Sequence, residues 1–200
     1  AIGINALSTD DTGSYAVAIG RNALLNQNAG DNSGNVAVGY NTGQAITTGN
    51  NNVFMGYVAG DATTTADNNT GIGYSALSAN TTGASNTGVG KDALLDNTTG
   101  TNNVAVGENA LANNTTASEN TAVGQNSSLT NTTGAANVSM GHDSMRLNTT
   151  GSSNVAIGYD AMRSNTTAGG NTAVGKAALT ANTTGDSNTA VGFECVEKCT

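Results

Sequence analysis

The chain has 200 residues, a formal net charge of −8 and 10% charged residues, and it contains 27 Gly but no Pro or Trp. Its six basic residues leave no positive surface for nucleic acid or an anionic membrane, and no apolar run approaches the roughly 20 residues of a membrane helix. With 36% hydrophobic and 4% aromatic residues, such a chain can fold only if its few apolar side chains recur regularly, which excludes most enzyme folds.

A 17-residue repeat begins at the start of the chain and continues to residue 192. Each unit has a Gly that ends a short apolar run. These glycines are 17 residues apart, except for one interval of 19 whose two extra residues are expected to loop out. Residues 1–192 are therefore predicted to form one repeat array. The glycines are Gly3, Gly20, Gly39, Gly56, Gly73, Gly90, Gly107, Gly124, Gly141, Gly158, Gly175 and Gly192.

Each position of the repeat, counted from the Asn that opens the unit, has its own chemical character. Position 1 is Asn in every unit from Asn35 to Asn188, position 2 is Val or Thr, and position 4 is Val, Ile or Met. Position 3 is small except at Phe54, positions 8 and 9 are mostly Ala and Leu, and positions 13 and 14 are mostly Thr-Thr. Almost all charges fall at positions 6, 7, 10, 11, 16 and 17, so positions 1–5, 8 and 9 are expected to be buried.

The unit is predicted to form one coil of a parallel β-solenoid, or β-roll, which is an all-β fold. Gly, Asn and Thr are weak helix formers, and the apolar run is rich in β-branched residues. Two short strands, separated by turns at Gly and at Asn-Thr-Thr-Gly, fit a coil of this length. Stacked coils, about 4.8 Å apart, would place equivalent residues in ladders, in which Asn amides can hydrogen-bond to one another whereas carboxylates would repel.

One face of the predicted strand is expected to pack against another chain. A thin core can be filled by positions 2, 4 and 9, which leaves position 3 on the opposite side of the strand. Because position 3 is small and never charged, we expect this side also to be buried. The pattern therefore predicts a homo-oligomer whose axis is lined by Ala37, Ala105, Ala122, Ala156, Ala173 and Ala190.

Motifs typical of enzymes are weak in this sequence. The stretch 170–176 matches most of a phosphate-binding loop, but Ala177 replaces the hydroxyl residue that would hold magnesium. His142 is the only histidine, and the acidic residues are scattered singly over different units. We predict no catalytic, cofactor-binding or metal-binding residues and no enzyme activity. Seven glycosylation sequons occupy a turn position that the repeat already explains: Asn80, Asn97, Asn114, Asn131, Asn148, Asn165 and Asn182.

Position 6 carries an aromatic row. Tyr40, Tyr57 and Tyr74 hold this position in consecutive units, and Tyr159 and Phe193 hold it further on. Rings on the outside of a fibre could stack on sugar rings, which makes the three consecutive tyrosines candidate glycan contacts. The alternative is that the rings stiffen the ladder or pack over a neighbouring strand.

Residues 193–200 keep the register of the array but diverge from its pattern. We expect them to begin a further repeat in a longer chain. Cys195 stands at the Ala position and Cys199 at the position that is usually Asn. The two cysteines are expected either to stay reduced or pair within the chain, or to form disulfides between chains.

The stretch 171–192, NTAVGKAALTANTTGDSNTAVG, resembles the repeats of bacteriophage tail fibres and related surface fibres, which often precede a C-terminal self-cleaving chaperone domain. Its Val-Ala-Val-Gly strand is also similar to the head repeat of trimeric autotransporter adhesins, a left-handed parallel β-roll of three chains. The resemblance implies a left-handed, trimeric β-roll in an extracellular protein, on a virion tail fibre or a bacterial cell surface.

We therefore expect the structural shaft of a trimeric extracellular fibre that projects a receptor-binding or adhesive tip. Its partner is the chain itself, with a cell-surface glycan or receptor as the candidate external ligand. No cofactor, nucleic acid or membrane insertion is expected. The alternative is a bacterial trimeric adhesin whose exposed ladders themselves bind host or glycan ligands. A third hypothesis is ice binding by the Thr-Thr ladder, although adjacent Thr side chains point to opposite faces.

Overall fold

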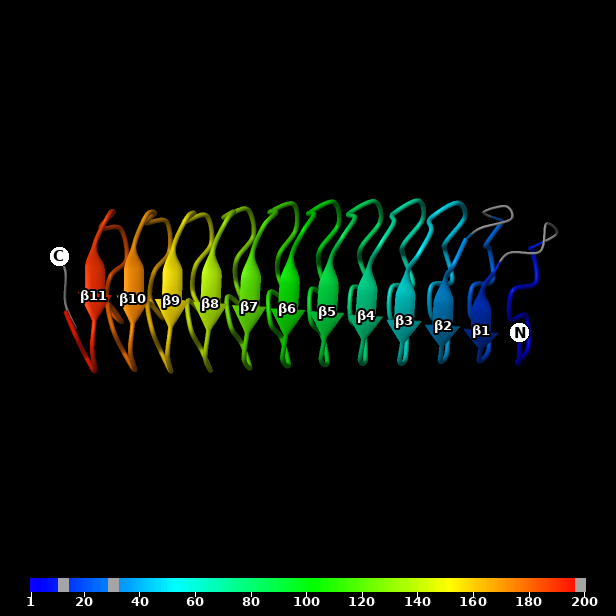
Figure 1. The fold of residues 1–200 in the computed structure, drawn as a ribbon, viewed down its shortest axis with the longest axis horizontal. Helices are drawn as coiled ribbons and strands as arrows, with labels where there is room; N and C mark the ends of the chain where they lie inside the picture. Colours follow the sequence, from blue (N-terminus) through cyan, green and yellow to red (C-terminus); the bar gives the residue numbers. More distant parts are fainter. Residues whose placement is uncertain (11–14, 29–32, 197–200) are drawn as a thin grey trace.

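The computed structural model describes residues 1–10, 15–28 and 33–196, and it shows a rod of stacked coils with the termini at opposite ends (Figure 1). The described residues form eleven short strands in one parallel sheet and no helix, which confirms the predicted all-β solenoid. Chain order and spatial order are the same. The strands are β1 (Val17–Ile19), β2 (Val36–Val38), β3 (Val53–Met55), β4 (Thr70–Ile72), β5 (Thr87–Val89), β6 (Val104–Val106), β7 (Thr121–Val123), β8 (Val138–Met140), β9 (Val155–Ile157), β10 (Thr172–Val174) and β11 (Thr189–Val191).

The register of the sheet follows the sequence repeat. Val36 is paired with Val53, one 17-residue unit further on. Val17 is paired with Val36 across the longer unit, so the register is kept in spite of the two extra residues. The loop was predicted between Gly20 and Gly39, and residues 29–32 of that interval lie outside the described residues. Eleven strands at about 4.8 Å spacing give a rod on the order of 50 Å long.

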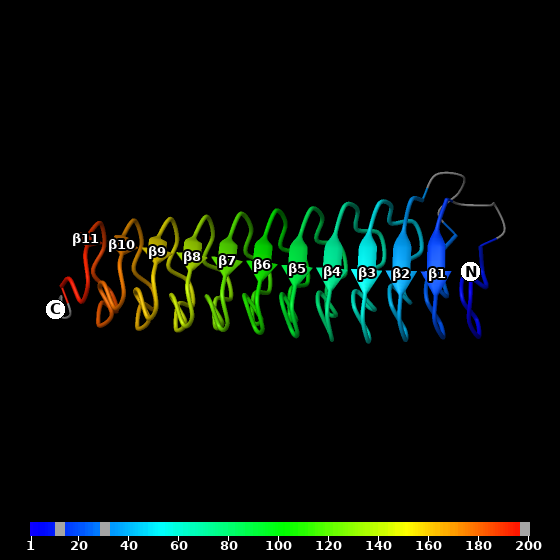
Figure 2. The same cartoon turned by 60° about the horizontal axis from the view of Figure 1, so that its bottom comes forward.

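The second strand predicted for each coil is wrong. Repeat positions 6–11 instead form a wound turn behind the strands (Figure 2), in which positions 7 and 9 have left-handed backbone angles, for example φ of 57° at Asn22 and 51° at Leu24. An extended strand cannot contain such residues. The coils are still joined by backbone hydrogen bonds, as from the Leu94 amide to the Ala110 carbonyl at 3.0 Å.

The Gly at position 5 turns the chain out of each strand. Gly90 has φ of 133°, a conformation that L side chains rarely adopt, and a Cβ there would lie 2.6 Å from the carbonyl oxygen of Gly107. Each such glycine therefore allows both the turn and the close stacking of the next coil. This explains why the period could be read from glycines alone.

The side chains of each strand point in the direction opposite to the one predicted. Position 3 points into the coil, where Ala105 is fully buried, and positions 2 and 4 point outward, where Val104 and Val106 are each 37% exposed. The wall behind the strand carries Ala at position 8 and Leu or Met at position 9, and these larger side chains leave room for only a small residue opposite. The predicted core at positions 2 and 4 is therefore wrong.

The predicted oligomer axis is wrong for the same reason. The six alanines assigned to it lie in the core of their own chain, with at most 2% of each residue exposed, and cannot contact a second chain. These residues are small because the coil is thin, and not because a second chain lies close to them. These residues are Ala37, Ala105, Ala122, Ala156, Ala173 and Ala190.

The apolar core is interrupted once along the rod. One hydrophobic cluster extends to Ala122 and a second begins at Met145. Between them the interior is filled by hydroxyl groups: the Oγ atoms of Ser127 and Ser139 are 2.7 Å apart, and those of Ser128 and Ser139 are 2.9 Å apart. Ser144 is also buried there and donates to the Ala156 carbonyl at 2.9 Å. Serine thus replaces the usual Ala and Leu in two consecutive coils.

Two buried Asn ladders run along the rod, and the predicted ladder at position 1 is confirmed. The Oδ1 atom of Asn35 accepts hydrogen bonds from the Asn52 backbone amide at 2.8 Å and from Asn52 Nδ2 at 3.2 Å. The second ladder is at position 12, where Asn97 Nδ2 donates to Asn80 Oδ1 at 2.9 Å and to the Gly100 carbonyl at 3.1 Å. From Asn80 to Asn182 the amides of this second row satisfy one another, whereas Thr63, which holds position 12 one coil earlier, has a buried Oγ1 without a hydrogen-bond partner.

Phe54 is the one large residue at position 3, and the surrounding coils are smaller to match. It is fully buried, and Gly43 and Gly60 replace the usual Leu at position 9. A Cβ on Gly60 would lie 2.5 Å from the Phe54 ring, and a Cβ on Gly71 would lie 2.8 Å from it. One ring therefore fills volume that several smaller side chains occupy elsewhere.

This exchange of volume can be tested by reversing it. We expect Phe54→Ala to lower the free energy of unfolding by about 3–5 kcal/mol, because it leaves a cavity. Adding Gly60→Leu should recover much of the loss, because Leu77 occupies the same position with φ of 57°, close to the 59° of Gly60. Gly60→Leu alone should destabilise by a clash with the ring. Urea denaturation measures all three variants, and a double variant no more stable than Phe54→Ala would contradict the packing argument.

Candidate functional surfaces

The described part of the chain offers surfaces rather than a pocket. It contains no pocket and no group of three or more His, Cys, Asp or Glu side chains that could hold a metal ion. The loop-like stretch 170–176 contains strand β10, as the equivalent stretch does in other coils, and no helix follows it among the described residues. None of the described segments is a helix long and apolar enough to span a membrane.

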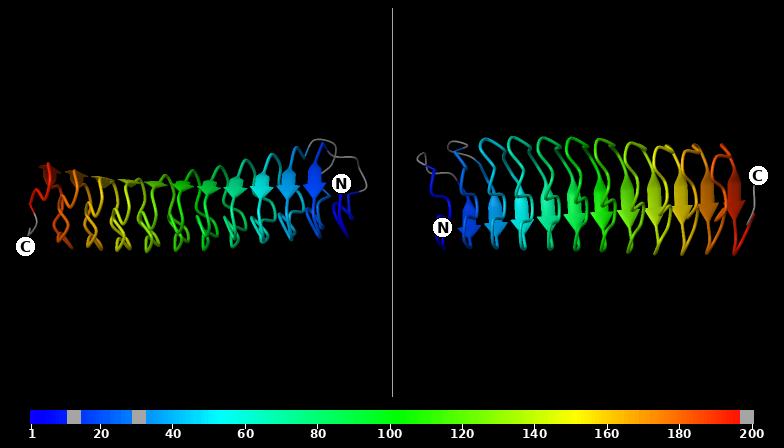
Figure 3. Two further views of the ribbon diagram at one scale, coloured as in Figure 1. Left: turned by 90° about the horizontal axis from the view of Figure 1, so that it is seen from below. Right: turned by 180° about the vertical axis from the view of Figure 1, so that it is seen from behind.

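The outer side of the parallel sheet, formed by positions 2 and 4 of β1–β11, presents the same kind of surface in each coil, and we call it the sheet face. It lines one wall of the rod along its whole length (Figure 3) and carries no charged residue. Met55 and Met140 are each 40% exposed on it. Position 4 is apolar in every strand and position 2 is Val or Thr, and an apolar row about 50 Å long marks an interaction surface. Its exposed large side chains are Val17, Ile19, Met55, Ile72, Val104, Val106, Met140, Ile157 and Val191.

The position 6 row follows one edge of the sheet face, and its aromatic part is a stack. Tyr40 and Tyr57 have ring centroids 5.1 Å apart with an interplanar angle of 10°, and Tyr57 and Tyr74 are 5.3 Å apart at 7°. The Arg21 guanidinium lies 5.9 Å from the Tyr40 ring centroid. Both faces of the Tyr57 ring are thus covered by its neighbours, and only ring edges and hydroxyls reach solvent.

The rest of the position 6 row is also paired within the chain. Lys91 Nζ donates to Glu108 Oε1 at 3.3 Å. His142 stacks on Tyr159, with ring centroids 5.2 Å apart. Lys176 lies between two rings, 5.9 Å from the centroid of Tyr159 and 5.3 Å from that of Phe193. Neighbours in the row therefore satisfy one another along the rod axis.

A charge cluster that was not predicted from the sequence joins two coils towards the C-terminal end of the rod, after strands β8 and β9 (Figure 1). Asp143 and Asp160 stand at position 7 of consecutive coils, and Arg163 Nε lies 4.0 Å from Asp143 Oδ2 and 3.6 Å from Asp160 Oδ1. Arg146 Nη1 is 3.5 Å from Asp143 Oδ2, and Asn126 Nδ2 donates to Asp143 Oδ1 at 3.0 Å. The signal was present in the sequence, because acidic residues 17 apart become neighbours in a solenoid. The cluster neutralises itself and leaves no vacant charge for a ligand.

The sequon asparagines form the position 12 ladder. Each of the seven residues is at most 1% exposed, and each Nδ2 donates a hydrogen bond to a neighbouring residue in the ladder or turn. The atom that a glycan would modify is therefore enclosed in the folded coil. This burial supports the explanation of these motifs as structural turns.

The two Thr positions differ in the folded coil. At position 13 the hydroxyl group is used by the backbone, as where Thr98 Oγ1 donates to the Thr115 carbonyl at 3.0 Å. Position 14 is exposed in every coil from Thr48 to Thr184. The rod thus presents one row of free Thr side chains, not the flat double row that the ice-binding hypothesis would favour.

Cys195 is the one described cysteine. It has a free thiol, is partly buried and packs against the second hydrophobic cluster. Cys199 lies outside the described residues. The predicted alternatives for the two cysteines stay predictions.

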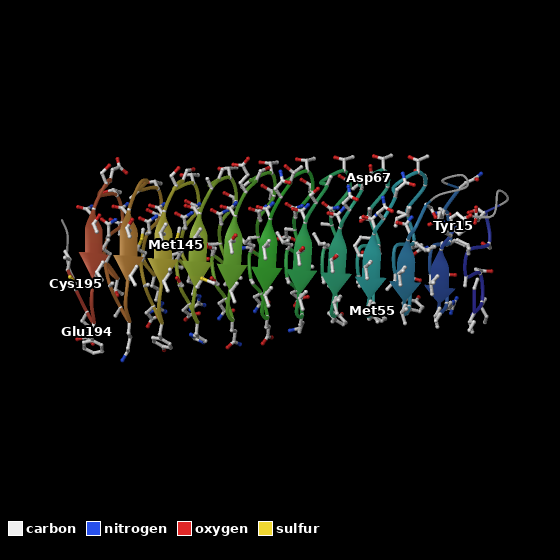
Figure 4. All side chains as sticks on the ribbon, viewed as in Figure 1. Tyr15, Met55, Asp67, Met145, Glu194 and Cys195 are labelled. Atoms are coloured by element: carbon white, nitrogen blue, oxygen red, sulfur yellow. The ribbon has the colours of Figure 1, made fainter. Side chains whose placement is uncertain are left out.

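No protein family, curated protein or solved structure matches the chain. Function must therefore be argued from the surfaces themselves. Charged side chains lie at the two turn edges, represented by Asp67 and Glu194, whereas the sheet between them carries apolar residues such as Met55 (Figure 4). The sheet face is the candidate functional surface.

The buried carboxylate of Asp61 gives a pH-dependent prediction. Burial raises the pKa of Asp61 above its ordinary value of 3.8, and Oδ1 is enclosed without a hydrogen-bond partner. A raised pKa in the folded state means that folding is favoured by protonation below pH 3.8, and this stability is lost as the pH rises through the raised value. We expect Asp61→Asn to raise the unfolding temperature at pH 7 but not near pH 3.

Thermal unfolding followed by circular dichroism at the two pH values checks this expectation. Asp96→Asn, at an exposed site, controls for the loss of one negative charge from the chain. An equal gain for Asp61→Asn at both pH values would show that burial of the carboxylate is not the cause.

Proposed function

We propose that this chain is the structural shaft of a trimeric extracellular fibre, such as a phage tail fibre or a similar surface appendage. The shaft projects a receptor-binding or adhesive tip. The observation that carries the proposal is the uncharged, exposed sheet face that runs along a rod whose described residues form no pocket. An extracellular location follows from the resemblance of residues 171–192 to the repeats of phage tail fibres and related surface fibres. The net charge of −8 disfavours nucleic acid as a partner.

Stiffness along the axis supports a mechanical role. Each coil is joined to the next by backbone hydrogen bonds, such as that from Val36 N to the Asn52 carbonyl at 2.8 Å. The buried Asn ladders and the hydroxyl row at position 13 add a further set of bonds in the same direction. Opening any coil exposes buried polar groups on both sides of it, which is costly. A rod of this kind suits a spacer that must transmit force and resist proteolysis.

The sheet face supplies the surface for self-association. Position 3 cannot do so because it is enclosed in its own coil. Three chains around one axis would cover their sheet faces against one another and remove a long apolar patch from water. The number three and the left-handed coil rest on the resemblance to the trimeric adhesin head.

Two neighbouring substitutions separate folding from assembly. We expect Val123→Glu, which points outward, to leave the β spectrum of the chain intact but to abolish the trimer. The charge would be placed in the contact between chains, which costs several kcal/mol. Ala122→Glu points into the coil and should disrupt folding itself. Circular dichroism measures the fold, and light scattering measures the mass.

Val123→Ile is the matched control, because Ile occurs at the same position in β4 and β9. It should assemble like the parent chain. Unimpaired assembly of Val123→Glu would show that the sheet face is not the contact, and a monomeric parent would refute the trimer.

The alternative function is an adhesin whose exposed ladders bind host or glycan ligands. The exposure of the tyrosine row favours it, with Tyr57 49% exposed. Sugar rings, however, stack on aromatic faces, and here both faces of Tyr57 and one face each of Tyr40 and Tyr74 are already occupied by neighbouring rings. The shaft is therefore the better-supported proposal.

The tyrosine row can be tested at its centre. Tyr57→Ala removes two ring stacks and should lower the free energy of unfolding by about 1–3 kcal/mol. It should not change binding to a glycan array. Tyr15→Ala, at an exposed site outside the row, should have a small effect on stability. Glycan binding by the parent that is lost in Tyr57→Ala would favour the adhesin instead.

A further inference from the structure

We propose that copies of this chain pack through their sheet faces in parallel and can slip by whole coils, so that the repeat array alone does not fix how the chains are aligned. The inference rests on the proposed function, because it concerns the assembled shaft. It adds a property of the contact, namely that one sheet face accepts another in several registers.

The period of the sheet face identifies its partner. Its side chains recur once per coil, about 4.8 Å apart, over all eleven strands. A rigid partner can match this surface along its whole length only if it has the same period. A second copy of the chain offers that period. The absence of charge on the face removes repulsion between copies.

The same regularity removes any strong preference for one alignment. Position 2 alternates irregularly between Val and Thr, which have nearly the same shape, and position 4 is Val, Ile or Met throughout. A shift by one coil therefore keeps apolar residues opposite one another at position 4 and exchanges only side chains of nearly the same shape at position 2, and all but one of the eleven strands stay in contact. Register is weakly specified where neighbouring positions are equivalent.

The charged residues at the edges of the sheet face do not fix how neighbouring chains are aligned. At one edge, in the position 6 row, Lys91 pairs with Glu108 of its own chain at 3.3 Å. Lys176 is likewise held between Tyr159 and Phe193 of its own chain.

At the other edge of the sheet face, Asp67 Oδ1 accepts a hydrogen bond from Asn50 N at 2.7 Å, and Asp186 Oδ1 accepts one from Gly169 N at 2.7 Å. Because these charges are compensated along the rod, they give a partner chain little by which to choose an alignment.

Cross-linking between single cysteines tests the proposal. In the full chain with Cys195→Ser and Cys199→Ser, one variant carries Met55→Cys and another carries Val106→Cys, at the same position of strands β3 and β6, which lie three coils or about 14 Å apart. Both native side chains are exposed. A short tag on one variant distinguishes the products on a denaturing gel. The two are unfolded together, refolded and treated with a short bifunctional maleimide.

We expect mixed Met55→Cys/Val106→Cys products at a yield of at least about a tenth of the like-with-like products, since a shift by three coils still leaves eight of the eleven strands in contact. Exchanging the tag controls for its effect. Like-with-like products in excess of roughly tenfold would mean a fixed register and overturn this inference while leaving the shaft intact. Monomeric chains would overturn the proposed function itself. Oligomers that cross-link in neither combination would show that chains meet through another surface, which overturns the inference.

Discussion

Equivalent residues lie one coil spacing apart along the whole rod, so that nearly every side chain has a like residue above it and below it. This spacing decides which chemistry each position tolerates. Asn can fill a buried row because its amide both donates and accepts, as between Asn80 and Asn97. Aromatic residues can stack, and a pair of aspartates can stand together only where arginines join them, as at Asp143 and Asp160. The regular stacking that stabilises the rod also makes its surface periodic.

The thinness of the coil is the second constraint. A single three-residue strand faces a turn that carries Ala and Leu, and there is room between them for little more than a methyl group. Where a phenyl ring is present, as at Phe54, the opposing positions become Gly. The larger Val, Ile and Met side chains of the strand are therefore displaced to the outside. A single chain thus exposes apolar residues that would form the core of a thicker protein, which links core packing directly to assembly.

The sequence was sufficient to predict the 17-residue coil, the parallel stacking and the Asn ladder, because each depends only on residues that recur at one spacing. It was insufficient for the direction of the strand. Alternation shows that Ala122 lies on the side opposite Thr121 and Val123, but not which side is inside. That choice depends on how the rest of the coil returns, through left-handed residues such as Leu94 at φ of 54°, which side-chain patterns do not reveal. The candidate surface was consequently placed on the wrong side, although self-association remained the expected function.

The serine cluster between the two hydrophobic segments has a mechanical consequence. A solenoid carries load through contacts between nearest neighbours only, so its strength is that of its weakest junction. Ser127, Ser128, Ser139 and Ser144 replace dispersion contacts with short hydrogen bonds at one such junction. Hydrogen bonds of this kind are brittle, since they are lost over a small displacement and water readily replaces them. Under tension we expect the coils to separate first at this junction and to leave two shorter segments of the solenoid folded.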